Sequence, residues 1–112
     1  NTLPFFLNTI DKAGLTNVVI PIISTSLEAG EVWSKPLAMV FIDGGHSEKA
    51  ANEDYDTWSP HLIKGGLLAI HDVFPNPEDG GRPPFNINTK AKESGLFKEL
   101  DMINSLALLE KL

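Results

Sequence analysis

The sequence predicts an α/β domain built around a mostly parallel sheet. Residues 37–43 and 67–70 form two apolar runs that each end in ionisable side chains, and a segment with helical spacing lies between them. A strand, a helix and a second strand within about 35 residues are typical of a parallel crossover. The chain has 112 residues, of which 42% are hydrophobic, so residues 1–112 are enough for one domain with a buried core.

The N-terminal part predicts a helix followed by an edge strand. Residues 2–13 carry apolar side chains at helical spacing, with Thr2 as the N-cap and Gly14 as the end of the helix. Residues 17–24 are rich in β-branched side chains, which favours a strand. Pro21 cannot donate a hydrogen bond to a neighbouring strand, so this strand belongs at an edge of the sheet.

Two strands and a helix make up the predicted centre of the domain. The continuous apolar run 37–43 indicates a parallel strand that is buried on both faces. Ser47 can cap the following helix, which carries apolar residues at helical spacing until Gly65 and Gly66 break it. Residues 67–70 then form the second buried strand.

The C-terminal part predicts a loop, a helix and a pair of strands. Residues 73–85 hold half of the chain's prolines and two glycines, which indicates a long loop. Residues 87–94 predict a short helix. Residues 97–112 predict two strands with a turn at Asn104, and a single helix over residues 100–112 is an open alternative, because periodicity does not separate the two.

Composition and charge exclude several classes of function. Nine basic and 15 acidic side chains give a formal charge of −6, and Arg82 is the only arginine, so we expect no nucleic-acid partner. The absence of cysteine excludes a disulfide framework, a thiolate zinc site and a cysteine nucleophile. No apolar run approaches the roughly 20 residues that span a bilayer. We therefore expect a cytoplasmic protein with no membrane partner.

Ionisable side chains follow both central strands. The first strand leads into Asp43, Gly44 and His46, and the second into His71 and Asp72. If the strands are neighbours, about 4.8 Å apart, these side chains converge where open parallel sheets bind their ligands. Asp43 and Asp72 can then hold a hard divalent cation, with His71 as a third ligand. His46 is the candidate general base, because its unperturbed pKa lies near neutrality.

Each of these residues also has a purely structural interpretation. Asp43 can shape the turn before the helix, and Asp72 can form a turn at the end of its strand. His71 can be a hydrogen-bonded core residue, and His46 an ordinary surface loop residue. One residue alone is weak support for a site, whereas the two clusters together indicate one.

A run of hydroxyl side chains lies at the end of the predicted edge strand. Ser24, Thr25 and Ser26 are placed at the same end of the sheet as the two acidic clusters. Their hydroxyl groups can contact a ligand, or they can cap a short helix over residues 26–33, and the sequence leaves both open.

The two strand-end motifs resemble a known family. The stretch Val40-Phe-Ile-Asp-Gly-Gly-His-Ser47, a helix with Asp54 and Trp58, and the stretch Leu62-Ile-Lys-Gly-Gly-Leu-Leu-Ala-Ile-His-Asp72 resemble class I S-adenosylmethionine-dependent methyltransferases. The most similar branch carries IDG-x-H after the fourth strand and GG…hD after the fifth. Residues 94–112 are similar to the antiparallel hairpin that closes this fold, so the resemblance covers nearly the whole chain.

The resemblance implies a Rossmann-like sheet with strand order 3-2-1-4-5-7-6 and S-adenosylmethionine lying across the strand ends. Thr25 and Ser26 would then lie near the adenine, and Asp43 and Gly44 near the donor. Residues 17–24 would be the third strand, which is an edge strand in that order.

The resemblance also implies a metal and a base. In related metal-assisted methyltransferases, the aspartates that match Asp43 and Asp72 bind Mg²⁺, and a histidine that matches His46 is the base in some of them. His71 departs from that pattern, because those enzymes carry an acidic residue before the last aspartate.

The family's glycine-rich first loop and the acidic residue that ends its second strand do not occur in this sequence, which starts at Asn1 without a methionine. We therefore expect a truncated fold, the C-terminal portion of a methyltransferase, whose first two strands are absent. In the intact order those strands lie between residues 17–24 and 37–43. The chain alone has to close this gap, exchange strands in a homodimer or leave sheet edges exposed.

The leading functional hypothesis is an S-adenosylmethionine-dependent methyltransferase that acts on a small-molecule hydroxyl, with or without Mg²⁺. The parent protein would be the enzyme, and this chain alone would be inactive. A metal-dependent hydrolase that uses Asp43, His46, His71 and Asp72 as ligands is one alternative. A non-catalytic α/β fragment that assembles with a partner through its exposed edges is the other.

Overall fold

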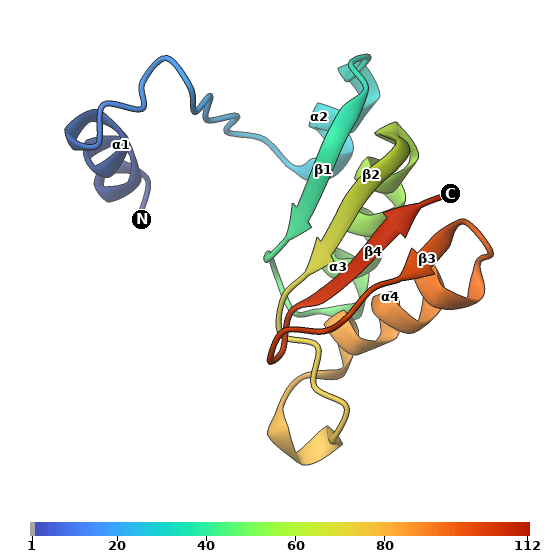
Figure 1. The fold of residues 1–112 in the computed structure, drawn as a ribbon. Helices are drawn as coiled ribbons and strands as arrows, with labels where there is room; N and C mark the ends of the chain where they lie inside the picture. Colours follow the sequence, from blue (N-terminus) through green and yellow to red (C-terminus); the bar gives the residue numbers. More distant parts are fainter. Residues whose placement is uncertain (1) are drawn as a thin grey trace.

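The computed structural model describes residues 2–112, which form a four-stranded sheet with helices against one face (Figure 1). The strands are β1 (Leu37–Ile42), β2 (Leu62–Ile70), β3 (Phe97–Glu99) and β4 (Ala107–Lys111). The helices are α1 (Leu3–Lys12), α2 (Ser26–Val32), α3 (Glu48–Trp58) and α4 (Arg82–Glu93), with 3₁₀ turns η1 (Ser59–His61) and η2 (Pro77–Asp79).

The strands lie in the order β1-β2-β4-β3. β1 and β2 are parallel, and β4 is antiparallel to both β2 and β3. This order equals the last four positions of 3-2-1-4-5-7-6, so the α/β class and the truncated methyltransferase-type sheet are confirmed. Ile42 pairs with Ile70, and therefore the carboxyl ends of β1 and β2 finish side by side.

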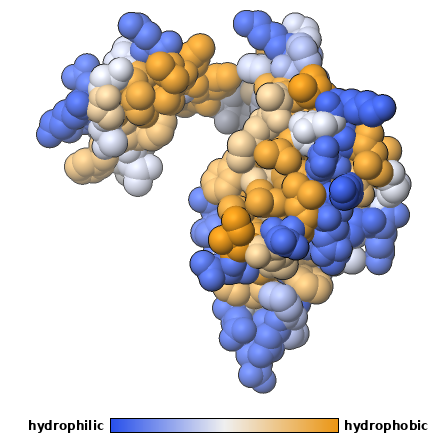
Figure 2. Space-filling model, in the orientation of Figure 1, coloured by the Kyte–Doolittle hydropathy of each residue, from blue (hydrophilic) through white to orange (hydrophobic). Residues whose placement is uncertain are grey.

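The hydrophobic core fills the space between one sheet face and the helices α3 and α4. Alternate residues of β1, β2 and β4 point into it, and Ile87 and Ala91 of α4 pack against them. The opposite face is open: Met39 and Phe41 are 51% and 53% exposed, and Figure 2 shows apolar side chains across this face. The expectation that β1 is buried on both faces is wrong, because within residues 2–112 the helices cover only one side.

Helix α1 confirms the first predicted helix and corrects its cap. Within the described residues, the Thr2 side chain makes no capping hydrogen bond. At the other end, Gly14 has φ +69° and donates its N–H to Asp11, while Leu15 donates to Ile10, which is a Schellman ending. The helix has no buried residue and lies away from the sheet (Figure 1).

The predicted edge strand over residues 17–24 is not a strand in this structure. A strand needs a neighbouring backbone to accept and donate its hydrogen bonds, and no strand within residues 2–112 lies beside this segment. Its β-branched residues are left exposed, with Ile20 at 79% and Ile23 at 76%. The β-branched residues thus give the segment a high strand propensity, but a strand forms only where another strand pairs with it.

Two boundaries near the centre and the C-terminus also differ from the prediction. β2 already begins at Leu62, because Gly65 adopts φ +82° and allows the pairing with β1 to shift from Leu62 to Leu67. Helix α4 starts at Arg82, inside the segment predicted to be a loop, because proline is accepted in the first turn of a helix. The hairpin of β3 and β4 is confirmed, and the helical alternative for residues 100–112 is wrong.

Candidate functional site

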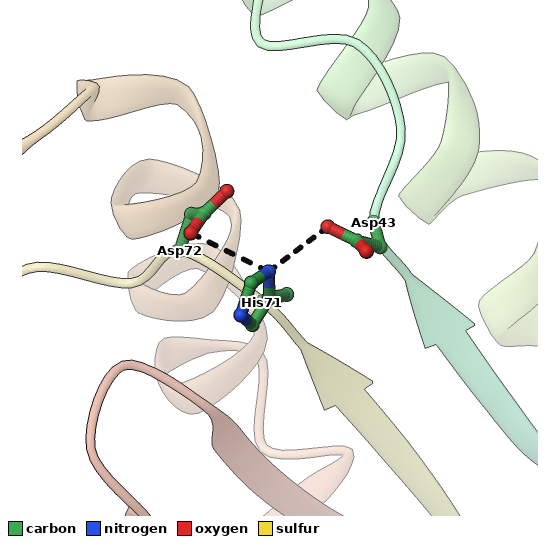
Figure 3. A group of neighbouring side chains, drawn as sticks. All are labelled: Asp43, His71 and Asp72. Carbon is green, nitrogen blue, oxygen red and sulfur yellow. Dashed lines mark hydrogen bonds and ion pairs between the residues drawn. The ribbon is translucent and has the colours of Figure 1, made fainter.

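Three ionisable side chains meet where β1 and β2 end, as Figure 3 shows. Asp43 follows β1 directly, and His71 and Asp72 follow β2. The Nδ1 atom of His71 lies 3.0 Å from Oδ1 of Asp43 and 3.4 Å from Oδ1 of Asp72. The register places them together, because the N–H of His71 donates to the carbonyl of Ile42 and continues the ladder by one step.

Asp72 has an unusual backbone conformation that aims its carboxylate at two histidines. Its φ is +61°, in the left-handed region that costs a non-glycine residue about 1–2 kcal/mol. Oδ1 faces His71, and Oδ2 lies 3.1 Å from Nε2 of His46. Aspartate adopts this conformation more readily than most residues, and here it turns the carboxylate toward both histidines.

His46 reaches the cluster from the loop between β1 and α3. The following residue, Ser47, caps α3 by accepting a hydrogen bond from the N–H of Ala50 at 3.0 Å. The His46 side chain is about half exposed, and its Nε2 atom faces Oδ2 of Asp72. The predicted convergence of Asp43, His46, His71 and Asp72 is therefore confirmed, and their roles stay predictions.

The cluster has a donor set that fits a divalent cation. One ligand atom each from Asp43, His71 and Asp72 lie within 4.8 Å of one another. Carboxylate oxygens suit Mg²⁺ and Mn²⁺, whereas an imidazole nitrogen suits Mn²⁺ and the later transition metals better than Mg²⁺. All three residues are partly exposed, so water could complete the coordination shell.

A hollow of about 280 Å³ lies beside this cluster, between β1, α2 and α3. Apolar residues of β1 and the Trp58 ring form its walls, and Asp43 and Gly44 lie at the end of the strand. Ser26 at the start of α2 and Asp54 on α3 complete it. The hollow therefore combines apolar walls with two carboxylates.

Hydrogen bonds inside the hollow link α2 to α3. The Ser26 hydroxyl donates to Oδ1 of Asp54 at 2.5 Å and accepts from Nε1 of Trp58 at 3.2 Å. Gly44 passes so close that a Cβ atom there would lie 2.9 Å from Oδ2 of Asp54. Thr25 has a different role, because its hydroxyl caps α2 by accepting from the N–H of Glu28 at 3.2 Å.

A family model for methyltransferase domains matches residues 3–73, well over half of the chain. The chain belongs to this methyltransferase-domain family. The match ends one residue beyond Asp72, so it contains both strand ends of the site.

Solved structures share the fold of this methyltransferase domain. A protein from Staphylococcus aureus, assigned as a caffeoyl-CoA O-methyltransferase, superposes with a TM-score of 0.77 at 18% identity, over 98% of this chain and 59% of the other. A Streptococcus mutans protein, assigned as a methyltransferase and crystallised with SAH, gives 0.68 at 17% identity, over 98% and 70%. A Clostridium thermocellum protein, assigned as an rRNA methylase, gives 0.61 at 18% identity, over 94% and 67%. The domain thus spans little more than half the length of the first of these proteins.

Asp54 lines the site, but the sequence indicates it only as part of the family resemblance and assigns it no role there. It lies seven residues after the cap Ser47 and four before Trp58, on the side of α3 that faces α2. An aspartate inside a helix is usually a solvated surface residue, so its spacing gives no sign of a role in a site.

Burial raises the pKa of Tyr55, and a hydrogen bond with Ser94 has a smaller, opposite effect on that pKa. This phenol lies in the core, outside the site.

None of the helices within residues 2–112 is long and apolar enough to cross a membrane.

Proposed function

We propose that the whole protein containing this methyltransferase domain transfers a methyl group from S-adenosylmethionine to the hydroxyl of a small molecule. The observation that carries the proposal is the convergence of Asp43, His46, His71 and Asp72 beside the hollow of α2 and α3. Open α/β sheets bind ligands at this end of their strands. Residues 1–112 supply the C-terminal portion of the fold.

The donor site in this proposal is the hollow and its rim. S-adenosylmethionine supplies, when bound, a methyl group on a positively charged sulfur. Ser26 and Gly44 line the hollow, and Asp43 lies between it and the cluster. Thr25 contributes by fixing the start of α2, since its side chain is used as the cap. The carboxylates suit a cationic donor.

His46 is the general base in this proposal, and Asp72 positions it. Oδ2 of Asp72 lies 3.1 Å from Nε2 of His46, and in this proposal the proton of the neutral ring is on Nε2, which leaves Nδ1 able to take the hydroxyl proton. The negative charge of Asp72 then stabilises the imidazolium that forms, as an aspartate does for the histidine of a catalytic triad. The hydroxyl oxygen becomes the nucleophile while the proton stays on His46.

The proposal also includes a divalent cation at the ends of β1 and β2. Asp43, Asp72 and His71 would hold it, and it would lower the pKa of a coordinated hydroxyl. The His71 nitrogen favours Mn²⁺ over Mg²⁺ at this site. Metal-dependent hydrolysis is the weaker interpretation of the same residues, because the chain belongs to a methyltransferase family.

The acceptor in this proposal lies beside the segment that follows Asp72. This segment is the nearest candidate wall for an acceptor. Arg82 fixes this segment by donating to the carbonyl of Phe74, and its guanidinium lies 4.4 Å from the centre of the Phe85 ring.

The charge of −6 supports an acceptor other than nucleic acid, and the lack of cysteine supports a cytoplasmic location. The exposed face of the sheet supports a homodimer.

Titration calorimetry and a methyl-transfer assay test the proposal. In the whole protein we expect SAH to bind with micromolar affinity and a mixture of small hydroxyl compounds to accept labelled methyl groups, with Mn²⁺ tested against Mg²⁺ and a chelator. Absence of SAH binding would refute the proposed function. The same titration into residues 1–112 then tells whether this part alone forms the donor site or needs residues upstream of it.

A further inference from the structure

The hollow beside β1 offers a ligand hydrogen-bond acceptors rather than donors. It contains two side-chain donors, the Ser26 hydroxyl and the Trp58 indole N–H, and both are used within the protein. The Ser26 proton goes to Oδ1 of Asp54, and the Trp58 proton goes to Ser26. What remains for a ligand on this side is a carboxylate oxygen, which only accepts hydrogen bonds when the group is ionised.

Oδ2 of Asp54 is the oxygen placed to meet such a ligand. An added Cβ on Gly44 would lie 2.9 Å from Oδ2, so this oxygen faces the bare backbone of the strand end and not the helix interior. The same hollow is lined by Val40 and Ile42 of β1 and by Trp58. A flat, mostly apolar ring with an amino group on its edge matches these walls and this acceptor.

We propose that Asp54 selects the nucleobase of the methyl donor, by accepting a hydrogen bond from the exocyclic amino group of a 6-aminopurine through Oδ2. This inference rests on the proposed function, because it takes the hollow as the donor site. Ser26 and Trp58 act through Asp54: the bond from Ser26 occupies Oδ1 and fixes the carboxylate plane, so that Oδ2 is presented to the hollow.

The proposal requires discrimination against a 6-oxopurine. Hypoxanthine carries an oxygen at position 6 and its donor, N1–H, one ring position away. In the pose of the 6-aminopurine its edge would therefore place an acceptor against the acceptor Oδ2. Loss of one hydrogen bond to a charged group is worth about tenfold or more in affinity, and repulsion between two acceptors adds to it. We therefore expect the protein to bind SAH at least about tenfold more tightly than S-inosylhomocysteine.

Asp54→Asn is the decisive variant, because it changes the hydrogen-bonding character without changing shape. The Ser26 proton still needs an acceptor, so the amide oxygen takes the place of Oδ1 and the NH₂ group replaces Oδ2. The hollow then presents a donor. We expect this variant to bind SAH more weakly and S-inosylhomocysteine more tightly than the unmodified protein does. The ratio of the two affinities should therefore fall to about one or reverse, which a misfolded variant cannot produce.

Calorimetric titration of both nucleosides into the whole protein and its variants carries out the test. Asp56→Asn is the matched control, because Asp56 lies on the same helix but pairs outward with Lys90 at 2.8 Å, and it should keep the preference of the unmodified protein. Equal affinity of the unmodified protein for the two nucleosides, or a preference that survives Asp54→Asn, would overturn the role of Asp54 and leave the proposed function intact. Binding of neither nucleoside to the unmodified protein would overturn both.

Discussion

Gly44 is required by the position of Asp54, and its replacement gives a quantitative test of the site geometry. In Gly44→Ala, the new Cβ would lie 2.9 Å from Oδ2 of Asp54, closer than real Cβ contacts allow. The carboxylate must either leave its rotamer, at a cost of about 0.5–1.5 kcal/mol, or give up the bond from Ser26, at about 1.5–3 kcal/mol. A gain of about 0.4–1 kcal/mol from the stiffer unfolded chain opposes this.

The expected net loss in the free energy of unfolding for Gly44→Ala is at most about 1 kcal/mol if only the rotamer changes, and about 0.5–2.5 kcal/mol if the bond from Ser26 is lost. Urea unfolding followed by tryptophan fluorescence measures it, and Trp58 in the hollow is itself a probe. Gly81→Ala is the matched control, because its Cβ would meet only Pro83 at an ordinary 3.7 Å. Gly81 is the N-cap of α4, where alanine is less favourable than glycine, and the stiffer unfolded chain opposes this cost, so the control should stay within about 1 kcal/mol of the unmodified chain.

A double-mutant cycle tells whether Asp54 is the cause. In an Asp54→Ala background the carboxylate is gone, so Gly44→Ala should cost little or become favourable through the unfolded state. An equal cost of Gly44→Ala in both backgrounds would refute the reasoning, because the loss would then come from the backbone and not from the contact with Asp54.

The remaining predictions concern chemistry, pH and assembly. In the whole protein, His46→Ala should lower turnover by about 10²–10⁴-fold with SAH affinity nearly unchanged; unchanged turnover would remove His46 from the mechanism. Asp43→Asn should weaken SAH or Mn²⁺ binding in calorimetry, and normal affinity for both would contradict its assignment. Because burial raises the pKa of Tyr55 in the folded state, the unfolded phenol loses its proton first, so the free energy of unfolding should fall as pH rises above about 10. Tyr55→Phe should remove that part of the pH dependence, and an identical alkaline profile would disprove it. If a second copy covers the open sheet face, sedimentation equilibrium should show a dimer that Phe41→Lys weakens; a monomer at all concentrations would contradict this.

The centre of the fold and the acidic cluster could be predicted because their signals are local. The run into Asp43 and the run into His71 and Asp72 each mark a strand and its end, and parallel strands bring such ends together. The cap Ser47 and the C-terminal hairpin have equally local signals. Predicting these parts requires only the pattern of neighbouring residues and the assumption of one parallel crossover.

Other features depended on groups distant in sequence. The β-branched segment 17–24 has the composition of a strand and yet is unpaired, because a strand exists only beside another. The roles of Ser26 and Asp54 arise from a hydrogen bond across 28 residues, which no spacing pattern encodes.

The sequence by itself therefore determined the α/β class, the two central strands and the four ionisable residues at their ends, since backbone propensity and hydrophobic pattern are properties of short segments. The tertiary structure alone decided that one sheet face stays open, that Asp72 contacts both histidines, and that the Asp54 carboxylate lies against Gly44. These are distances between segments far apart in the chain, and packing fixes them.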